Sequence, residues 1–443
     1  MSYRPKPDIS AVPTIPDHVY YDVLISNYNS ATGAPIPIYF NENRTNPIIP
    51  VTGEYEMSIV RFSVDTNDLP ILIPTITPGS DTIDLTDYII TLAIKPVGSS
   101  VTYFAQSPVV WVTQDSTAPI PLPPSQTGTG FQSTFGDYYY CYSYAHFQSL
   151  VTTALVSCWT QLKAILAAVT PTPYLDLVNI LPPVMSWDTT TNSAVISVPQ
   201  FNALGKPCFD TRYIDASGNL ITNVNGVKMY FNTPLYQLFS SFNSQFQGVG
   251  TTLSGQGQIY GYSGGTIQWN VSTSFTGCDY TITIVNDGGT NQILAPNIYP
   301  VTNPNTAGNT KNLYLQIFQE YSTIVNWSPV SSIVFVSNTL PIVSNQIASP
   351  VIYNENQIVT GNGNNSRFAQ IITDIESNEQ SYKPNLLYNP TAEYRMISMT
   401  GNRPLTNVDI SVFWRSKLGN LVQLNLLSGG SCSIKFLFRK RIV

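Results

Sequence analysis

The sequence predicts a mainly β protein made of one or more antiparallel β-sandwiches of the jelly-roll type, with two amphipathic helices and long loops. Three observations carry this prediction. Short runs rich in β-branched and aromatic residues recur along the 443-residue chain. Only two segments show helical periodicity. Long polar, Pro-rich or Gly-rich connections separate the strand-like runs, as is typical of sandwiches.

Residues 1–18 are expected to form an extended N-terminal arm. Pro5, Pro7, Pro13 and Pro16 favour an open, polyproline-like path. Such a segment cannot bury itself, so it is either mobile or laid on a neighbouring subunit. The stretch has no apolar signal-peptide region, and the chain has no run of about 18 apolar residues that predicts a membrane span.

A β-sandwich that also contains both helices is expected over residues 19–247. Its strand-like runs are VYYDVLIS, YEMSIVRFSV, YIITLAIK and VVWVT. In the second run, Ser58, Val60, Phe62 and Val64 alternate with residues of the opposite face, which predicts a strand with one buried side.

The longer helix is expected near residues 145–169. Its apolar positions follow three-four spacing: Phe147, Leu150, Val151, Ala154, Leu155, Cys158, Leu162, Ile165, Leu166 and Val169. Pro171 and Pro173 end it, and Gln161 and Lys163 argue for a core helix rather than a membrane span.

The second helix is expected over residues 233–246. Thr233 can cap it and Pro234 suits the first helical position. Five apolar residues share one face: Leu235, Leu238, Phe239, Phe242 and Phe246.

The Gly-rich segment 248–265 is expected to be a loop or domain junction, and residues 266–443 a second β-rich region. Asp287-Gly288 and Leu418-Gly419-Asn420 are expected hairpin turns. Alternating Val408, Ile410, Val412 and Trp414 predict another half-buried strand. The similar segments SIVRFSVDTNDLPI and SIVFVSNTLPI leave open whether a sandwich has been duplicated.

Charged residues are scarce in this chain. They make up 10% of it, against roughly 25% in an average soluble domain, and 27 residues are Tyr. Because protein interfaces are poor in Lys and Glu and rich in Tyr, this composition favours a surface covered by other subunits. A secreted β-protein with the same polar, uncharged composition remains an alternative.

Net charge argues against a general nucleic-acid binder. The formal charge is −6, where such a binder needs a basic excess. The exception is the basic C-terminal end, with Lys435, Arg439, Lys440 and Arg441, which could touch nucleic acid or an acidic partner. A solvated strand end is the more ordinary interpretation.

The stretch DYYYCYSYAH, residues 137–146, raises the question of a reactive site. It holds five tyrosines together with Cys141 and His146, and the only other histidine, His18, lies in the arm. No family-type signature supports a Cys/His pair, so an aromatic strand leading into the longer helix is the preferred interpretation. Its alternating tyrosines would cover two faces.

Other chemistry is equally unsupported. The five cysteines are scattered without a C-x-x-C motif, which predicts buried thiols rather than a zinc or disulfide framework. Asp81, Asp84 and Asp87 fit no calcium loop, and no nucleotide-binding motif occurs. Asp374 and Glu376 resemble a solvated loop rather than a glycosidase pair. We therefore predict no catalytic, cofactor-binding or metal-binding residues, and no enzymatic activity.

A family resemblance points in the same direction. The segments PDHVYYDVLISN and EYEMSIVRFSVDTNDLPI near the N-terminus, and SIVFVSNTLPIVSNQ, IITDIE, EYRMISMTGNRPLTNVDISVFWRSKLGNLVQL and GGSCSIKFLFRK near the C-terminus, resemble minor capsid or penton proteins. These are structural proteins of Polinton-like viruses and their virophage relatives in the adenovirus lineage. The resemblance covers about half the chain.

The resemblance implies a jelly-roll capsid protein of the virion that assembles with itself and with a major capsid protein. A pentamer, a host receptor and a weak genome contact through the basic end belong to this expectation, as do synthesis and assembly in the host cytoplasm or nucleus. The chain is long for one jelly roll, which implies a further domain.

Three alternatives stay open. The first is a major capsid subunit with two jelly rolls. The second is a receptor- or glycan-binding spike that uses Trp111, Trp187, Trp269 and Trp327. The third and weakest is a glycoside-active enzyme.

Overall fold

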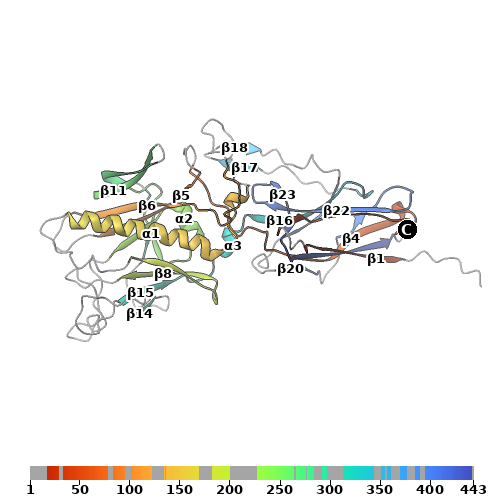
Figure 1. Ribbon diagram of the computed structural model, residues 1–443, viewed down its shortest axis with the longest axis horizontal. Coiled ribbons are helices and arrows are strands. Elements are labelled where there is room, and N and C mark those ends of the chain that lie inside the picture. The colour runs from red at the N-terminus through yellow and green to blue at the C-terminus, as the bar shows by residue number, and fades with distance from the viewer. Residues whose placement is uncertain are drawn as a thin grey trace, which may run out of the picture. The chain divides into compact units, whose positions relative to one another are not determined.

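The chain folds into two compact units (Figure 1). The jelly-roll unit consists of residues 1–70 and 329–443, and the inserted unit of residues 71–328. The computed structural model describes residues 17–28, 33–77, 83–94, 101–121, 134, 136–168, 182–199, 227–263, 266–275, 277–283, 292–296, 313–343, 351–354, 357–360, 370–376, 385–389 and 395–441. The predicted arm lies almost wholly outside these residues.

Eight strands of the jelly-roll unit form two antiparallel sheets. In chain order they are β1 (His18–Ser26), β3 (Tyr39–Asn43), β4 (Tyr55–Asp65), β16 (Val330–Ser337), β19 (Gln370–Glu376), β20 (Asn385–Tyr388), β22 (Asn407–Ser416) and β25 (Ser431–Lys440). The first sheet has the order β1-β25-β4-β20, and the second has the order β3-β22-β16-β19. The first strand thus pairs with the eighth, the second with the seventh, the third with the sixth and the fourth with the fifth. This is the winding of a jelly roll, and it confirms the predicted fold class.

Shorter elements extend these sheets. A 3-10 helix, η1 (Thr52–Glu54), precedes β4. The short strands pair as follows: β2 (Ile36–Pro37) with β24 (Asn425–Leu426), β21 (Ile397–Ser398) with β4, β23 (Leu421–Gln423) with β22, and β17 (Val351–Asn354) with β18 (Gln357–Thr360). The predicted turn at Leu418-Gly419-Asn420 joins β22 to β23, and Gly419 has a φ of 84° that favours glycine. The other predicted turn, Asp287-Gly288, lies outside the described residues.

The core of the jelly-roll unit lies between its two sheets. The alternating residues of β22 are at most 1% exposed, as predicted: Val408, Ile410, Val412 and Trp414. Phe62 and Phe335, one from each sheet, meet edge to face with ring centroids 4.8 Å apart. These two residues belong to the similar segments noted in the sequence, which therefore form facing sheets of one sandwich.

A β-bulge in β4 breaks the alternation that the sequence predicts. Arg61 pairs with Lys435 and Ile59 with Phe436, so that Val60 is the extra residue. Both Ile59 and Val60 are consequently buried.

Within the jelly-roll unit, the start of β4 lies beside the start of β1 and the end of β25. Lys440 pairs with Tyr55 at the start of β4, and β1 begins at His18 beside Arg439. The insertion follows the far end of β4. The segment after β16 returns toward Tyr55, because Ile342 pairs with Met399 and Met399 N–H donates to the Tyr55 carbonyl.

The inserted unit contains two sheets and a long helix. The seven-stranded sheet has the order β10-β13-β9-β5-β6-β11-β12, and the four-stranded sheet has the order β14-β15-β8-β7. The strands are β5 (Leu85–Ile94), β6 (Tyr103–Val110), β7 (Val184–Asp188), β8 (Ser193–Pro199), β9 (Lys228–Phe231), β10 (Ser244–Phe246), β11 (Leu253–Ser263), β12 (Thr266–Phe275), β13 (Tyr280–Ile282), β14 (Gln292–Pro296) and β15 (Leu313–Phe318). Since β11 runs parallel to β6, this unit is not a second jelly roll.

The helix α1 (Tyr144–Ala167) packs against β5, β6 and β7, and Figure 1 shows it running between β6 and β8. Eight of its predicted apolar positions are buried: Phe147, Leu150, Val151, Ala154, Leu155, Cys158, Leu162 and Leu166. It is long and apolar enough to cross a membrane, but 50% of its most apolar stretch is buried inside the protein, which agrees with the predicted core helix.

The second predicted helix is shorter than the sequence indicated. The helix α2 (Thr233–Leu238) begins after Asn232, whose side chain, not that of Thr233, caps the Leu235 N–H. It ends early because residues 244–246 pair with β13 as β10, and backbone pairing outweighs the helical spacing of the phenylalanines. A short helix, α3 (Ile324–Trp327), was not predicted.

The predicted domain boundary also differs from the observed one. The sequence places a junction at residues 248–265, but most of this segment is β11, which pairs with β12 and β6. Residues 19–70 pair with strands from the other end of the chain instead of with the segment that follows them. Local composition carries no signal of such distant pairing.

Candidate assembly surfaces

Cys141 and His146 do not form a reactive pair. The Cys141 thiol is buried and donates to the Ser143 carbonyl at 3.2 Å, and burial raises its pKa to about 11. It is therefore protonated at neutral pH and unreactive. His146 instead has its Nε2 2.8 Å from the Val112 carbonyl, and its ring meets Trp111 edge-on.

The tyrosine-rich stretch is not the alternating strand that the sequence suggested. Residues 137–139 form a 3-10 helix, η2 (Asp137–Tyr139), and Cys141 makes an isolated bridge with Leu72. Tyr138, Tyr139 and Tyr140 are consecutive and all buried. The stretch therefore builds one core rather than covering two faces.

The remaining sequence candidates for chemistry have structural roles. Asp84 accepts a hydrogen bond from the Tyr138 hydroxyl at 2.8 Å, and Asp81 lies outside the described residues. Within the described part of the chain, no group of three or more His, Cys, Asp or Glu side chains could hold a metal ion. The four described cysteines are buried, as expected, and none of these four is in a disulfide: Cys141, Cys158, Cys278 and Cys432.

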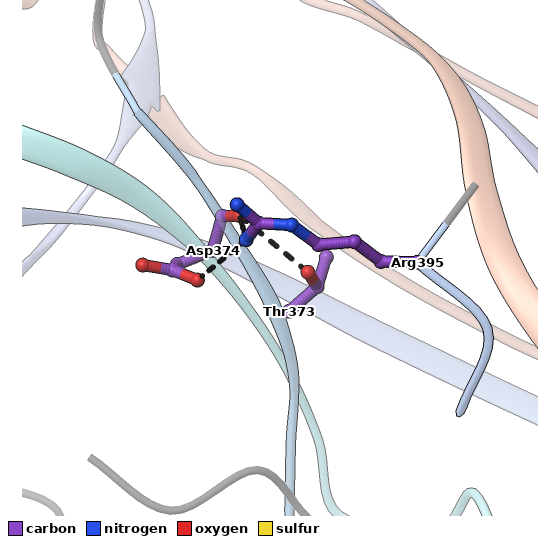
Figure 2. A network of polar contacts seen from close by, with 3 residues as sticks. All are labelled: Thr373, Asp374 and Arg395. Carbon is purple, nitrogen blue, oxygen red and sulfur yellow. Dashed lines mark hydrogen bonds and ion pairs between the residues drawn. The ribbon is translucent and has the colours of Figure 1, made fainter. Parts of the chain in front are cut away.

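Asp374 takes part in a contact that ties the two sheets of the jelly roll together at one flank. Figure 2 shows the Arg395 guanidinium reaching Asp374: Nη1 donates to its carbonyl at 3.0 Å and to its Oδ1 at 3.1 Å. Asp374 lies on β19, the edge strand of the second sheet, and Arg395 just precedes β21, which pairs with β4 of the first sheet. The side chain of Glu376 lies outside the described part.

The opposite flank is tied by Tyr21. Its hydroxyl donates to Glu42, so that β1 of the first sheet is joined to β3 of the second. Phe40 and Arg44 also lie against the Tyr21 ring, at 6.3 Å and 5.9 Å from its centroid. Burial and the neighbouring Glu42 carboxylate raise the pKa of Tyr21 to about 12.

The outer face of β1 has the character of a subunit contact. Tyr20 and Leu24 are 61% and 72% exposed, and Asp22 between them binds Arg61 at 3.5 Å and Lys435 at 3.3 Å. Among the strands that the structure describes, β1 has a partner on one side only, so its other edge is open. An open edge with exposed Tyr and Leu is a site where another chain can add. The sequence marked the strand but could not show that it lies at an edge.

The basic residues of β25 are engaged inside the jelly-roll unit. Lys435 binds Asp22, Arg439 binds Glu56, and Lys440 binds Glu54 at 3.6 Å. Arg441 donates to the Met399 carbonyl at 2.7 Å. The acidic partners on β1 and around β4 thus offset the local positive charge.

Two of the four candidate sugar-binding tryptophans belong to the core of the inserted unit, and a third packs against that core. Trp111 and Trp327 are at most 2% exposed, and the Trp187 ring stacks on Tyr144 at 4.7 Å beside that core. The side chain of Trp269 lies outside the described residues.

Comparison with known proteins shows the family to which the chain belongs. The family model for Sputnik minor capsid protein V18/19 matches residues 19–440, which is nearly the whole chain. The chain belongs to this family of minor capsid proteins. It is therefore a structural protein of a viral capsid, located in the virion, where it contacts other capsid proteins.

Two proteins of Sputnik virophage are similar to this member of the V18/19 family. Uncharacterized protein V18 is 33% identical over 157 residues, which cover 35% of this chain and 90% of V18. Structural protein V19 is 30% identical over 151 residues, which cover 34% of this chain and 66% of V19.

Two solved structures share the fold. A chain of the Sputnik virophage particle, determined by cryo-EM, matches with a TM-score of 0.64 and 25% identity over 96% of this chain and 98% of that one. The mavirus penton protein matches with a TM-score of 0.50 and 14% identity over 96% of this chain and 100% of that one, which shows a shared fold alone.

Proposed function

We propose that this minor capsid protein is a penton-type subunit, which forms a homopentamer at capsid vertices and is held there by a major capsid protein. The observation that carries the proposal is one jelly roll per chain, made by strands from both ends of the sequence. A major capsid subunit with two jelly rolls fits less well, because the inserted unit has a parallel strand pair and an enclosed helix.

A closed ring of identical subunits needs two different faces that fit each other. The jelly-roll unit offers two flanks of unlike chemistry. One carries the open β1 edge with Tyr20 and Leu24, and the other carries the Arg395–Asp374 pair beside β19. Contact between unlike flanks of successive copies is consistent with a ring.

The measured mass of the purified full chain tests this proposal. We expect light scattering coupled to size exclusion to give five times the chain mass of 48.8 kDa, and electron microscopy to show fivefold rings. Replacing Leu24 by Asp on the open β1 face should reduce the mass to that of a monomer. Leu418→Asp, at an exposed residue in the turn between β22 and β23, is the matched control and should leave the mass unchanged.

A monomer of the unaltered chain, in the presence and absence of the major capsid protein, would contradict a vertex role. Genome contact through β25 and Arg441 has little support, because their basic side chains already bind acidic or carbonyl groups of the same unit.

A further inference from the structure

We propose that Arg395 guards an open sheet edge of the jelly-roll unit. Its guanidinium occupies the backbone carbonyl of Asp374 on β19 and so prevents a second copy of this chain from adding a strand there. The inference deepens the proposed ring by naming what keeps the copies from joining in the wrong way. It rests on that proposal only for the choice of a second copy as the partner.

The edge strands of the two jelly-roll sheets differ in length. Among the strands that the structure describes, β1 and β20 are the edges of the first sheet, and β3 and β19 lie at opposite edges of the second. The strands β20 and β3 have four and five residues, whereas β1 has nine and β19 has seven. Since short edges are poor templates for pairing, β1 and β19 are the two edges at which another chain could add.

The direction of the β19 backbone follows from the neighbouring strands. Val412 on β22 donates to the Ile38 carbonyl at 3.1 Å and accepts from the Leu424 N–H at 3.0 Å. Both partners lie on the side of β22 that faces away from β16. Backbone groups of successive residues point to opposite sides of a strand, so those of Phe413 point toward β16.

The same alternation continues across β16 to β19. Val334 lies opposite Phe413 and therefore directs its N–H and carbonyl toward β22. Asp374 lies opposite Val334 on the other side, so these two residues pair without backbone hydrogen bonds. The N–H and carbonyl of Asp374 consequently point to the open side of β19, where an added strand would bind them.

Arg395 occupies this outward carbonyl. Its Nη1 donates to the carbonyl at 3.0 Å and to Asp374 Oδ1 at 3.1 Å. Figure 2 shows the guanidinium against Asp374, and the Thr373 hydroxyl also donates to the same carbonyl, at 3.4 Å. The Arg395 side chain is largely exposed. An incoming strand would therefore have to displace a charged donor, whose hydrogen bonds are stronger than those of a neutral N–H.

A β-bulge in β19 closes the same edge further. Phe335 pairs with Thr373 and Val336 with Ile371, so Ile372 is the extra residue. A bulge bends and twists an edge strand, which makes it a poorer template. By contrast, β1 pairs with β25 in an unbroken register over all nine residues. Two protective features thus coincide at β19, while β1 keeps the regular geometry that another chain can extend.

A guard at β19 favours closed assembly. Backbone pairing between an edge of one copy and an edge of the next can repeat without limit, and it gives fibres or aggregates rather than a ring. Every copy carries β1 as a regular strand that could pair in this way. With the β19 edge occupied, contact between unlike flanks has to use side chains, whose shape can set the rotation that closes a ring.

Light scattering coupled to size exclusion tests the guard on the purified full chain. Arg395→Ala should shift the mass toward species larger than any that the unaltered chain forms. Asp374→Asn removes the ion pair but keeps the carbonyl that Arg395 occupies, and should leave the mass unchanged. Arg403→Ala is the matched control, because Arg403 is an exposed arginine of the same unit, between β21 and β22, and its loss should not change the mass.

A proline at the same edge separates strand addition from unfolding. Asp374→Pro removes the outward N–H without breaking a bond to β16, and proline is tolerated at such positions of edge strands. Combined with Arg395→Ala, it should restore the mass of the unaltered chain, whereas aggregation caused by unfolding would persist. Hydrogen exchange gives a direct readout: the Asp374 amide should become protected in the large species of Arg395→Ala.

Three results would overturn the inference: an unchanged mass for Arg395→Ala, large species of Asp374→Asn that match those of Arg395→Ala, or no restoration by the added proline. A monomeric unaltered chain whose Arg395→Ala variant forms large species with a protected Asp374 amide would refute the ring and leave the guard intact. A ring that Arg395→Ala does not alter would do the reverse.

Discussion

At the residue scale, the two buried carboxylates of the described residues, Asp279 and Asp409, are held by hydrogen bonds from hydroxyl and backbone N–H groups. Asp409 on β22 is 3% exposed and accepts from the Asn338 and Thr339 N–H groups at 2.8 Å and 2.9 Å. The Ser337 and Thr339 hydroxyls also donate to it. It thereby fixes the turn that follows β16 across to the neighbouring strand β22.

The pKa of Asp409 makes this contact sensitive to acid. Burial alone would raise that pKa, but the hydrogen bonds outweigh it and lower the pKa below the ordinary value. A folded-state pKa below the unfolded value of about 3.9 stabilises the fold above that pH, and the contribution disappears as the pH falls through the folded value.

We therefore expect Asp409→Asn to lower stability at pH 7 by about 1–3 kcal/mol, since donors are left poorly paired. Urea unfolding between pH 7 and pH 3 is the measurement. The difference in free energy of unfolding between the variant and the unaltered chain should become smaller as the pH falls. A gap that stays constant over this range would show that Asp409 does not act through its charge.

Cys141 and its neighbouring tyrosines give a second test at this scale. Cys141→Ser should leave the oligomer mass and capsid assembly intact and change stability by about 1 kcal/mol or less, because a serine hydroxyl can keep the hydrogen bond that the protonated thiol donates to the Ser143 carbonyl. Tyr140→Ala with Tyr142→Ala should impair folding or assembly, since Tyr140 is 4% exposed and meets Tyr142 edge-on. Loss of assembly with Cys141→Ser alone would point to chemistry at the thiol.

At the scale of elements, α1 organises the inserted unit through an aromatic cluster at its first turn. Phe147 is fully buried and contacts the rings of Tyr88, Phe239 and Trp327 at centroid distances of 5.5, 6.5 and 5.3 Å. Trp327 also donates its indole N–H to the Leu238 carbonyl at 2.7 Å, which joins α3 to the end of α2. The helix α1, the end of α2 and the helix α3, which are distant in sequence, thus meet at Phe147.

Phe147→Ala should destabilise the inserted unit by about 3–5 kcal/mol, because it removes a ring that three others surround. Thr153→Ala, at an exposed position of the same helix, should change stability by less than about 0.5 kcal/mol. Differential scanning calorimetry measures both effects. Similar unfolding temperatures for the two variants would mean that the aromatic cluster does not stabilise the inserted unit.

At the scale of the whole molecule, the basic side chains of β25 form ion pairs with acidic side chains of the same unit, which leaves them less able to bind a polyanion. The chain carries a formal charge of −6, and its basic strand β25 lies between acidic residues of β1 and β4. We expect no mobility shift of double-stranded DNA at about 150 mM salt, where non-specific binders depend on free phosphate contacts. Binding that disappears when Lys435 and Arg439 are both replaced by Gln would contradict this expectation.

The local elements of this protein were predictable because their causes are local. The three-four spacing from Phe147 to Leu166 predicted α1, and the alternation from Val408 to Trp414 predicted β22 and its buried face. The shortage of charge and the absence of any chemical motif favoured a structural protein, and the family match shows a minor capsid protein.

Other features depend on contacts between distant residues. Only the tertiary structure shows that the chain leaves the jelly roll after β4 and returns at β16, because His18 and Arg439 pair across almost the entire sequence. Contacts between distant segments also account for three local differences. Cys141 pairs with Leu72 after a 3-10 helix where a tyrosine strand was expected, and β4 has a bulge at Val60 where it pairs with β25. Residues 244–246 pair with β13 as a strand where a helix was expected. Composition and spacing set which segments can be buried, while the pairing of remote backbones decided which ones are.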